Sequence, residues 1–283
     1  MLKLKLIAFT WGIMLKLEIL MSCMYQKDFS LVIESRITGD VLIINQTDDN
    51  FILEEKRDFQ KIRMLGTTER GLSRSRNMAI QNSLGDICLL CDDDEEMADN
   101  YESIILETFR NTPNADVIAF NIKNKETRLS NRKQKIGYLN CLKITSYQIA
   151  FRRTPVLARG IRFDPLMGAG SCNGGGEENK FLWDCLRNGL HVYYSPLIIA
   201  TILEKSSTWF FGYDETFFYQ RGAATRYMMG GLPSIFYGVY YLLRKRALYK
   251  ETISTIQAAK KLFQGIAENP IAHQKLEQNG DKK

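Results

Sequence analysis

The chain has 283 residues, of which 45% are hydrophobic and 25% charged, and its formal net charge is +6. These values are ordinary for a globular protein and exclude a disordered or collagen-like chain. The length suits one large domain, or one domain with an extension. The positive charge is mild and is not interleaved with aromatic residues, which argues against nucleic acid as a partner. It would suit a phosphorylated substrate or an anionic membrane surface.

Cysteine and histidine usage narrows the chemistry further. The six cysteines have no zinc-like spacing. Cys88 and Cys91 lie within an apolar run, where alternation directs them to opposite faces of a strand. We therefore expect buried free thiols in a reducing compartment. With only His191 and His273 in the chain, we expect neither a His-based triad nor a multi-His metal site.

The N-terminus repeats itself, because residues 1–7 are echoed by residues 14–20. Residues 1–13 lack an apolar run long enough to span a membrane, and they lack a small-residue cleavage site. We interpret them as a leader extension and expect the folded domain to begin near Met14. The chain is expected to remain in the cytoplasm, either free or on the inner face of the cell membrane.

Two strand–helix units open the expected domain. A strand over residues 17–23 precedes a helix over 27–35, and a buried strand over 41–44 ends in a polar run. Polar residues that follow buried strands in this way are typical of a doubly wound α/β domain.

Residues 71–77 read Gly-Leu-Ser-Arg-Ser-Arg-Asn and begin a helix that we expect to reach residue 85, with Ser73 as its N-cap. Arg74 and Arg76 in the first turn oppose the helix macrodipole, which favours negative charge there. A phosphate would relieve this conflict, since arginine at a helix N-terminus binds phosphate well. We favour such an anion site over the alternative of two exposed arginines.

An apolar strand that begins at residue 86 ends in five acids, residues 92–96. Carboxylates this close raise one another's pKa, so they need a cation or open water. In open α/β sheets, ligands bind beyond the carboxyl ends of the strands. We interpret Asp92 and Asp94 as ligands of Mg²⁺ or Mn²⁺ bridging to phosphates. The alternative is a solvated acidic turn that caps a helix over 99–110.

The next segments are less uniform. A strand is expected over 116–122 and a charged surface segment over 123–134, whereas residues 136–151 show strand-like patches that we leave unassigned. The glycine-rich residues 168–176 form a mobile loop, and they lack the Lys-Ser/Thr of a phosphate-binding loop. Glu177 and Glu178 then begin a helix. They are either favourable charges at its N-terminus or a general base delivered by a closing loop.

The C-terminal part changes character after a strand-like segment over 191–203. Residues 227–243 carry no charge and precede the basic residues 244–246. This stretch is slightly short for a membrane span of about 20 residues, and glycines and Pro233 interrupt it. We weigh an element lying in the membrane interface against a helix packed on its own domain, and favour a spanning helix least. A final amphipathic helix over 248–266 precedes a polar tail that we expect to be disordered.

Together these features resemble family 2 glycosyltransferases of the GT-A fold, particularly bacterial enzymes of capsule or cell-surface polysaccharide assembly. Four motifs carry the resemblance over residues 17–210: Ile-Leu-Met-Ser in the first strand, Gly-Leu-Ser-Arg-Ser-Arg-Asn, Asp-x-Asp after an apolar strand, and Gly-Glu-Glu-Asn before a helix. It implies an α/β fold with a Rossmann-like, mostly parallel mixed sheet flanked by helices over residues 14–210. A helical extension over 211–270, touching the membrane interface, and a polar tail over 271–283 would follow.

The resemblance also implies site roles. The expected contacts to the nucleotide sugar are Ser22, Gln46, Arg76, Asp92 and Asp93. The expected metal ligands are Asp94, Asp92 and Glu204. Glu178 matches the general base, with Glu177 as its rival. Gln46 stands where many relatives have an aspartate, Glu204 stands near a position where relatives often have histidine, and the processive Gln-x-x-Arg-Trp motif is absent.

The expected activity is metal-dependent, inverting transfer of a sugar from a nucleotide-diphosphate sugar, with UDP-sugars favoured. The acceptor would be a hydroxyl group of a glycan, lipid-linked and reached at a membrane surface. One alternative is a non-catalytic carbohydrate- or nucleotide-binding subunit with the same fold. Another is a nucleotidyltransferase, which would usually have a glycine-rich basic loop where this chain has Ser-Cys-Met-Tyr-Gln after its first strand.

Overall fold

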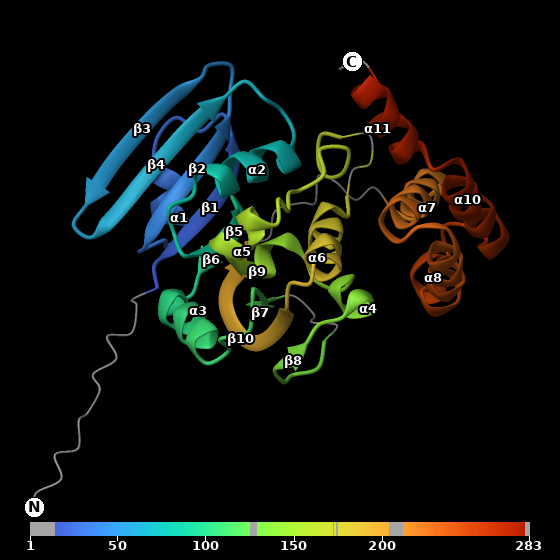
Figure 1. Ribbon diagram of the computed structural model, residues 1–283. Coiled ribbons are helices and arrows are strands. Elements are labelled where there is room, and N and C mark those ends of the chain that lie inside the picture. Colours follow the sequence, from blue (N-terminus) through green and yellow to red (C-terminus); the bar gives the residue numbers. More distant parts are fainter. Residues whose placement is uncertain (1–14, 125–128, 172, 174, 204–211, 281–283) are drawn as a thin grey trace, which may run out of the picture.

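The computed structural model describes residues 15–124, 129–171, 173, 175–203 and 212–280 (Figure 1). The expected leader and Glu204 lie outside these residues. The strands are β1 (Leu17–Met24), β2 (Asp40–Gln46), β3 (Phe51–Arg57), β4 (Gln60–Thr67), β5 (Ile87–Asp92), β6 (Glu95–Met97), β7 (Val117–Lys123), β8 (Gln134–Lys135), β9 (Ile149–Arg152) and β10 (Val192–Ile202). The helices of the α/β part are α1 (Ser30–Glu34), α2 (Leu72–Asn82), α3 (Tyr101–Arg110), α4 (Tyr138–Cys141), the 3₁₀ helix η1 (Ser146–Gln148), α5 (Arg153–Ala158) and α6 (Glu177–Arg187).

The described strands form one mixed sheet in the order β3-β4-β2-β1-β5-β9-β7-β10-β6, with β8 paired to β10. Strands β4, β2, β1 and β5 are parallel neighbours. β9 lies between β5 and β7 and is antiparallel to both. The carboxyl ends of β1, β2 and β5 therefore meet at one edge, where ligands of open α/β sheets bind.

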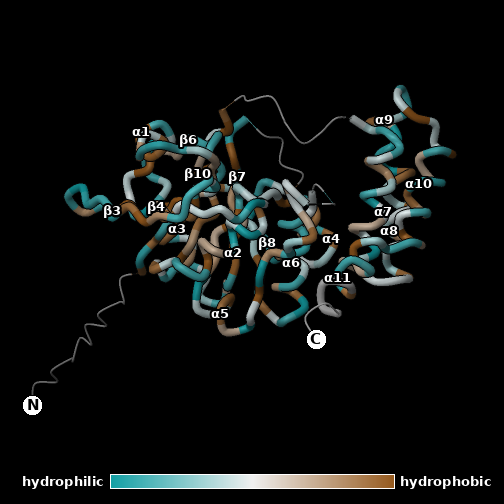
Figure 2. The backbone as a smooth tube through the Cα atoms, turned by 90° about the horizontal axis from the view of Figure 1, so that it is seen from above, coloured by the Kyte–Doolittle hydropathy of each residue, from teal (hydrophilic) through white to brown (hydrophobic). Residues whose placement is uncertain are grey.

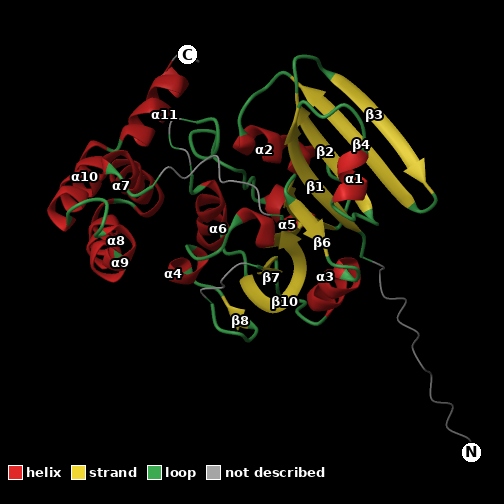
Figure 3. Cartoon of the chain, turned by 180° about the vertical axis from the view of Figure 1, so that it is seen from behind, coloured by secondary structure: helices red, strands yellow, loops and turns green. Residues whose placement is uncertain are grey.

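Both faces of the sheet are covered by helices (Figures 1 and 3), as expected of an α/β fold. Helices α1 and α3 pack in one hydrophobic core, and α2, α4, α5 and α6 pack in the other. Cys91 belongs to the first core and Cys88 to the second, so the predicted alternation of the two thiols is confirmed. Every cysteine in the described part of the chain is free and buried.

The C-terminal helices form a bundle that stands beside the sheet (Figure 2). They are α7 (Glu215–Met229), α8 (Gly231–Arg244), α9 (Arg246–Tyr249), α10 (Thr255–Glu268) and α11 (Pro270–Gly280). Helices α7 and α10 cross in close contact, because a Cβ added at Gly222 would lie 2.0 Å from the carbonyl oxygen of Leu262. On the other helix, a Cβ at Gly265 would lie 2.1 Å from the carbonyl oxygen of Tyr219.

The bundle is fastened to the α/β part at Asp164. Its carboxylate accepts a hydrogen bond from the hydroxyl of Tyr227 on α7 and another, of 3.1 Å, from Nζ of Lys275 on α11. Residues that we expected in a disordered tail are thus helical, because Lys275 has a buried carboxylate to bind.

Several elements differ from the sequence-based expectations. The β3–β4 hairpin was not anticipated. The final helix expected over 248–266 is divided into α9 and α10, and the uncharged stretch over 227–243 is divided between α7 and α8 at Gly230, whose φ is +82°. None of the described helices is long and apolar enough to cross a membrane.

Candidate active site

The predicted site residues of β1, β2 and β5 gather at one edge of the sheet. Ser22 pairs in register with Asp92 across β1 and β5, and Met24 pairs with Gln46 across β1 and β2. The Oγ of Ser22 accepts a hydrogen bond of 2.8 Å from the Ser75 hydroxyl of α2. Residues from separate parts of the sequence are therefore neighbours here, as their positions after strands predicted.

Arg76 is a buried cation at the centre of this site. Its Nη2 donates to Oδ1 of Asp92 at 2.8 Å, and its Nη1 donates to Oε1 of Glu177 at 3.0 Å. The guanidinium also lies over the ring of Phe163, 5.4 Å from the centroid. A buried charge is tolerated when it is paired and hydrogen-bonded. Arg76 thus joins the acidic end of β5 to the first residue of α6.

This arrangement corrects our reading of the α2 N-terminus. Helix α2 begins at Leu72 after Gly71, whose φ is +113°, so Arg76 lies beyond the first turn. Both Nη groups of Arg76 donate hydrogen bonds to carboxylates, so they do not face an open anion site. Arg74 is exposed. Ser73 is not the N-cap, because its Oγ donates to the carbonyl oxygen of Met167 at 2.7 Å.

The two glutamates that begin α6 differ in their surroundings. Glu177 is buried and paired with Arg76. Glu178 is partly buried, and loss of water together with the nearby charge of Glu177 raises the pKa of Glu178 to about 8, although Arg76 opposes the rise. A carboxylate with a pKa near neutrality is suited to general base catalysis. Glu177 is therefore the residue that holds Arg76, and the raised pKa of Glu178 agrees with its expected role as the base.

The acidic turn after β5 is only partly solvated. Asp93 and Asp94 form the turn between β5 and β6, and Asp93 is exposed. Glu95 is buried, and its Oε1 accepts a hydrogen bond of 2.7 Å from the backbone N–H of Asp92. Burial, followed by the charge of Asp92, raises the pKa of Glu95 well above its usual value. The expectation of five solvated or metal-bound acids is therefore wrong for Glu95, which is buried beside Asp92.

The helix-capping alternative for the acidic turn is not observed either. Strand β6 separates the turn from α3, and the N-cap of α3 is Asn100, whose side chain makes no capping hydrogen bond.

The donor set agrees only in part with a metal site. Asp92 and Asp94 supply carboxylate oxygens, which Mg²⁺ and Mn²⁺ prefer. One oxygen of Asp92 is bound to Arg76, and the other accepts a long hydrogen bond of 3.4 Å from Ser146. Within the described ranges, no group of three or more His, Cys, Asp or Glu residues is placed to hold a metal ion. Two carboxylates would be enough for Mg²⁺ when substrate phosphates and water complete its ligands.

Gln46 has a structural use that its sequence position did not reveal. Its Oε1 accepts a hydrogen bond of 2.7 Å from the backbone N–H of Gly71. The side chain is buried and holds the segment that leads into α2.

Sequence reasoning missed the residues that η1 and α7 bring to the site. Tyr147 lies near Asp92, Glu95 and Glu178, whose charges add to burial in raising its pKa. Arg221 of α7 lies over the ring of Tyr241, 4.6 Å from the centroid. Burial lowers the pKa of Arg221, but Tyr241 and, to a smaller degree, the charge of Glu178 raise it above its usual value. The capping box formed by Thr145 and Gln148 marks η1 and is a signal that the sequence does contain.

The glycine-rich segment is hydrogen-bonded to the start of α2 at Ala169. The backbone N–H of Leu72 donates to the carbonyl oxygen of Ala169 at 3.1 Å. Gly168 has a φ of +96°, and a Cβ there would lie 3.0 Å from the carboxyl carbon of Glu177. This part of the expected mobile loop is therefore closely packed.

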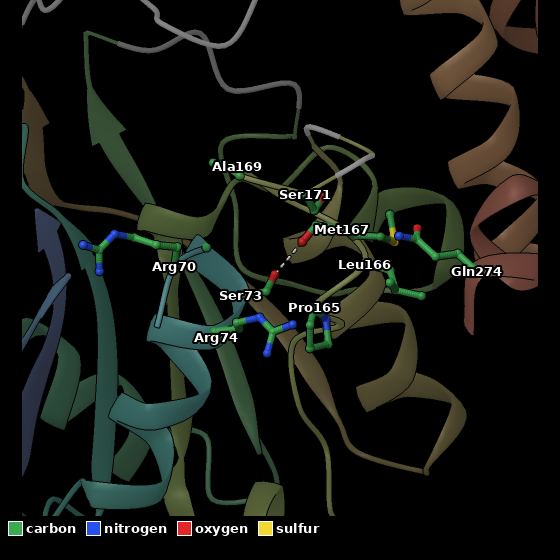
Figure 4. Close-up of a pocket in the computed structure, with 11 residues that line it drawn as sticks. Arg70, Ser73, Arg74, Pro165, Leu166, Met167, Ala169, Ser171 and Gln274 are labelled. Atoms are coloured by element: carbon green, nitrogen blue, oxygen red, sulfur yellow. Dashed lines mark hydrogen bonds between the residues drawn. The ribbon is translucent and has the colours of Figure 1, made fainter. Parts of the chain in front are cut away.

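Beside the glycine-rich segment lies a cavity of about 240 Å³ (Figure 4). The residues that line it are Arg70, Gly71, Ser73, Arg74, Pro165, Leu166, Met167, Ala169, Gly170, Ser171 and Gln274.

Comparisons with known proteins place this geometry in a family context. A family model described as "Glycosyl transferase family 2" matches residues 40–167. The structure resembles S. aureus TarS 1–349 in complex with UDP-GlcNAc, with a TM-score of 0.54 and 13% identity over 75% of this chain and 66% of that one. It also resembles TarS 1–349 in complex with UDP, with a TM-score of 0.56 and 12% identity over 84% of this chain and 74% of that one.

The extent of these matches differs between relatives. The chain spans slightly less than two thirds of the TarS chain bound to UDP-GlcNAc, and 44% of the longer TarS chain, where the TM-score is 0.54 and the identity 13%. At this level of identity the likeness shows the fold, an α/β fold of the GT-A type. No curated protein matches the chain.

Proposed function

We propose that the chain is a family 2 glycosyltransferase, because the model of that family matches residues 40–167. It would transfer a sugar from a UDP-sugar to a hydroxyl group of a glycan acceptor, with inversion at the anomeric carbon. The observation that carries this proposal is the pairing made by Arg76. It joins Asp92, at the ligand-binding edge of the sheet, to Glu177, which precedes Glu178 on α6.

The choice of donor rests on the related fold. TarS binds UDP-GlcNAc and UDP, and we extend the nucleotide, though not the sugar, to this chain. Ser22, Asp92 and Asp93 lie at the carboxyl ends of β1 and β5, the edge where nucleotides bind in open α/β sheets. Gln46 would act indirectly, by holding Gly71 and the segment that leads into α2.

The acceptor hydroxyl must lose its proton as it attacks the anomeric carbon. Glu178 would accept that proton, because its raised pKa makes it a stronger base than an ordinary carboxylate. Glu177 and Arg76 would fix the position of Glu178 at the start of α6. A single displacement of this kind needs no covalent nucleophile and inverts the anomeric centre.

The leaving diphosphate needs its charge neutralised. A bound Mg²⁺ or Mn²⁺ would supply Lewis-acid stabilisation of that charge. Asp94 and the oxygen of Asp92 that is not bound to Arg76 are the residues that would hold it, with Glu204 as the third expected ligand.

We assign the catalytic domain to residues 14–210 and the helical extension to residues 211–270. The acceptor would be a lipid-linked glycan of a surface polysaccharide such as a capsule, used on the cytoplasmic side of the membrane. The family match favours this transferase over the nucleotidyltransferase and the non-catalytic subunit.

The proposal is tested by calorimetric titration of the purified chain with UDP, GDP and dTDP, each with and without Mn²⁺. We expect UDP to bind, and to bind only with Mn²⁺. Asp94→Asn should abolish this binding without lowering Tm, whereas Asp99→Asn, which changes an exposed acid of the same region, should leave it unchanged. Failure of all three nucleotides in both conditions would overturn the transferase. UDP binding that survives Asp94→Asn would overturn the metal assignment.

A further inference from the structure

Helix α8 exposes a continuous apolar stripe. The side chains on it recur at intervals of three and four residues, which places them on one face of a helix. They are between 42% and 73% exposed, and are Leu232, Ile235, Phe236, Val239, Tyr240 and Leu243. A row of large apolar side chains on one exposed face marks an interaction site.

The opposite face of α8 explains why the stripe cannot turn inward. Ser234, Gly238, Tyr241 and Leu242 are buried against the rest of the bundle. A Cβ at Gly238 would lie 2.7 Å from a methyl group of Leu262 on α10, so the two helices are in close contact. The rotation of α8 about its axis is therefore set by packing. The bundle that contains α8 stands beside the sheet (Figures 1 and 3), and the side chains of the stripe are exposed.

The residues that follow the stripe are mainly basic. They are Arg244, Lys245, Arg246 and Lys250, and the one acid beside them, Glu251, is paired with Lys250 at 3.3 Å. Arg244, Arg246 and Lys250 are exposed and follow the C-terminal end of the stripe. A surface that is apolar on one face and basic at its end complements an anionic lipid bilayer. A second copy of the chain would instead meet the same cations, and Glu251 is the one acid in residues 216–254.

We propose that α8 docks the chain on the surface of an anionic lipid bilayer. The helix lies in the plane of the interface, its apolar stripe enters the boundary between head groups and acyl chains, and the basic residues after it bind lipid phosphates. With 14 residues, α8 is about 21 Å long, which is too short to cross the hydrocarbon core of about 30 Å. This proposal goes beyond the transfer reaction and stands independently of nucleotide binding.

The experiment is co-sedimentation of the full chain with vesicles of phosphatidylcholine alone and of phosphatidylcholine with 30% phosphatidylglycerol. We expect binding to the anionic vesicles only, weakened by 0.5 M NaCl because exposed charges are screened. The double variant Phe236→Glu, Leu243→Glu should lose binding at least tenfold. The double variant Arg244→Gln, Arg246→Gln should bind about thirtyfold more weakly, since each basic residue near the surface contributes about a factor of five.

A matched control is available on α10, where Ile256 is 82% exposed and lies outside the stripe. Ile256→Glu should bind vesicles as the unchanged chain does, and each variant should keep its Tm and its UDP titration. Equal binding by the stripe variant and the control would overturn the proposal, as would no binding to anionic vesicles. A dimer in light scattering that Phe236→Glu, Leu243→Glu converts to a monomer, with no vesicle binding, would assign the stripe to a second copy instead.

Discussion

Replacing Arg76 by methionine should destabilise the fold far more than an ordinary arginine substitution. Methionine keeps much of the side-chain length but removes the cation that pairs with Asp92 and Glu177. The side chain of Glu177 is only 9% exposed, so its carboxylate would be left buried and uncompensated. The side chain of Asp92 is 28% exposed and can recover part of its hydration.

The magnitude follows from these exposures. Removing one partner of a buried ion pair costs about 3–5 kcal/mol. Since only the carboxylate of Glu177 would be left buried without a partner, we expect a loss of stability at the lower end of this range, about 3 kcal/mol. For a domain of this size that corresponds to a fall in Tm of roughly 6–12 °C. UDP binding should also weaken, because the position of Asp92 is no longer fixed.

The assay is thermal and urea unfolding of the unchanged chain and two matched variants. Arg74→Met changes an exposed arginine two residues earlier in the same helix, and should alter stability by no more than about 0.5 kcal/mol. Arg63→Met breaks the other buried pair, with Glu18, and should destabilise as Arg76→Met does while sparing UDP affinity. The reasoning is refuted if Arg76→Met loses less than about 1 kcal/mol, or no more than Arg74→Met.

Four further predictions concern the base and the bundle. Glu178→Gln should abolish turnover while UDP still binds, and Glu177→Gln should chiefly lower Tm; the opposite pattern in rates and titrations would exchange their roles. The acidic limb of the pH–rate profile should lie well above pH 4.5, because activity is lost as pH falls through the raised pKa of Glu178; a limb near 4.5 would contradict this. The same shift means that the native fold favours the protonated form of Glu178. The stability gained from that form is complete below about pH 4.5 and is lost as pH rises through about 8. The urea midpoint of Glu178→Gln should not show that loss. Gly222→Ala should separate α7 from α10, since its Cβ would overlap the backbone of Leu262; an unchanged Tm would refute the close crossing.

The parts of the fold that could be predicted are those whose signal is local. The buried strands around Ile19, Ile43 and Leu89 are continuous apolar runs, and their positions were expected to within a few residues. The β3–β4 hairpin was missed because β3 lies at the sheet edge, where most of its side chains are exposed and carry no apolar period. The break between α9 and α10 occurs at a capped start, Ser254 with Gln257, inside what looked like one amphipathic helix.

The site was predictable as a location rather than as a set of contacts. Polar residues after strands placed Ser22 and Asp92 at one edge correctly. The pairing of Arg76 with Glu177 could not be found in this way, because Glu177 lies 101 residues further along the chain. Glu95 was grouped with its acidic neighbours because nothing local distinguishes it. Its burial depends on the short strand β6, where it pairs with Ile202 of β10.

The position of β9 has a consequence for the order in which the chain can fold. β5 has β1 on one side and β9 on the other, and β9 is also one of the two neighbours of β7. During synthesis, the apolar β5 therefore has one open edge until residues 149–152 have been made. An open edge of this kind invites pairing with other chains. Chains that stop before β9 should aggregate, whereas those that continue through β9 can close the sheet between its two halves.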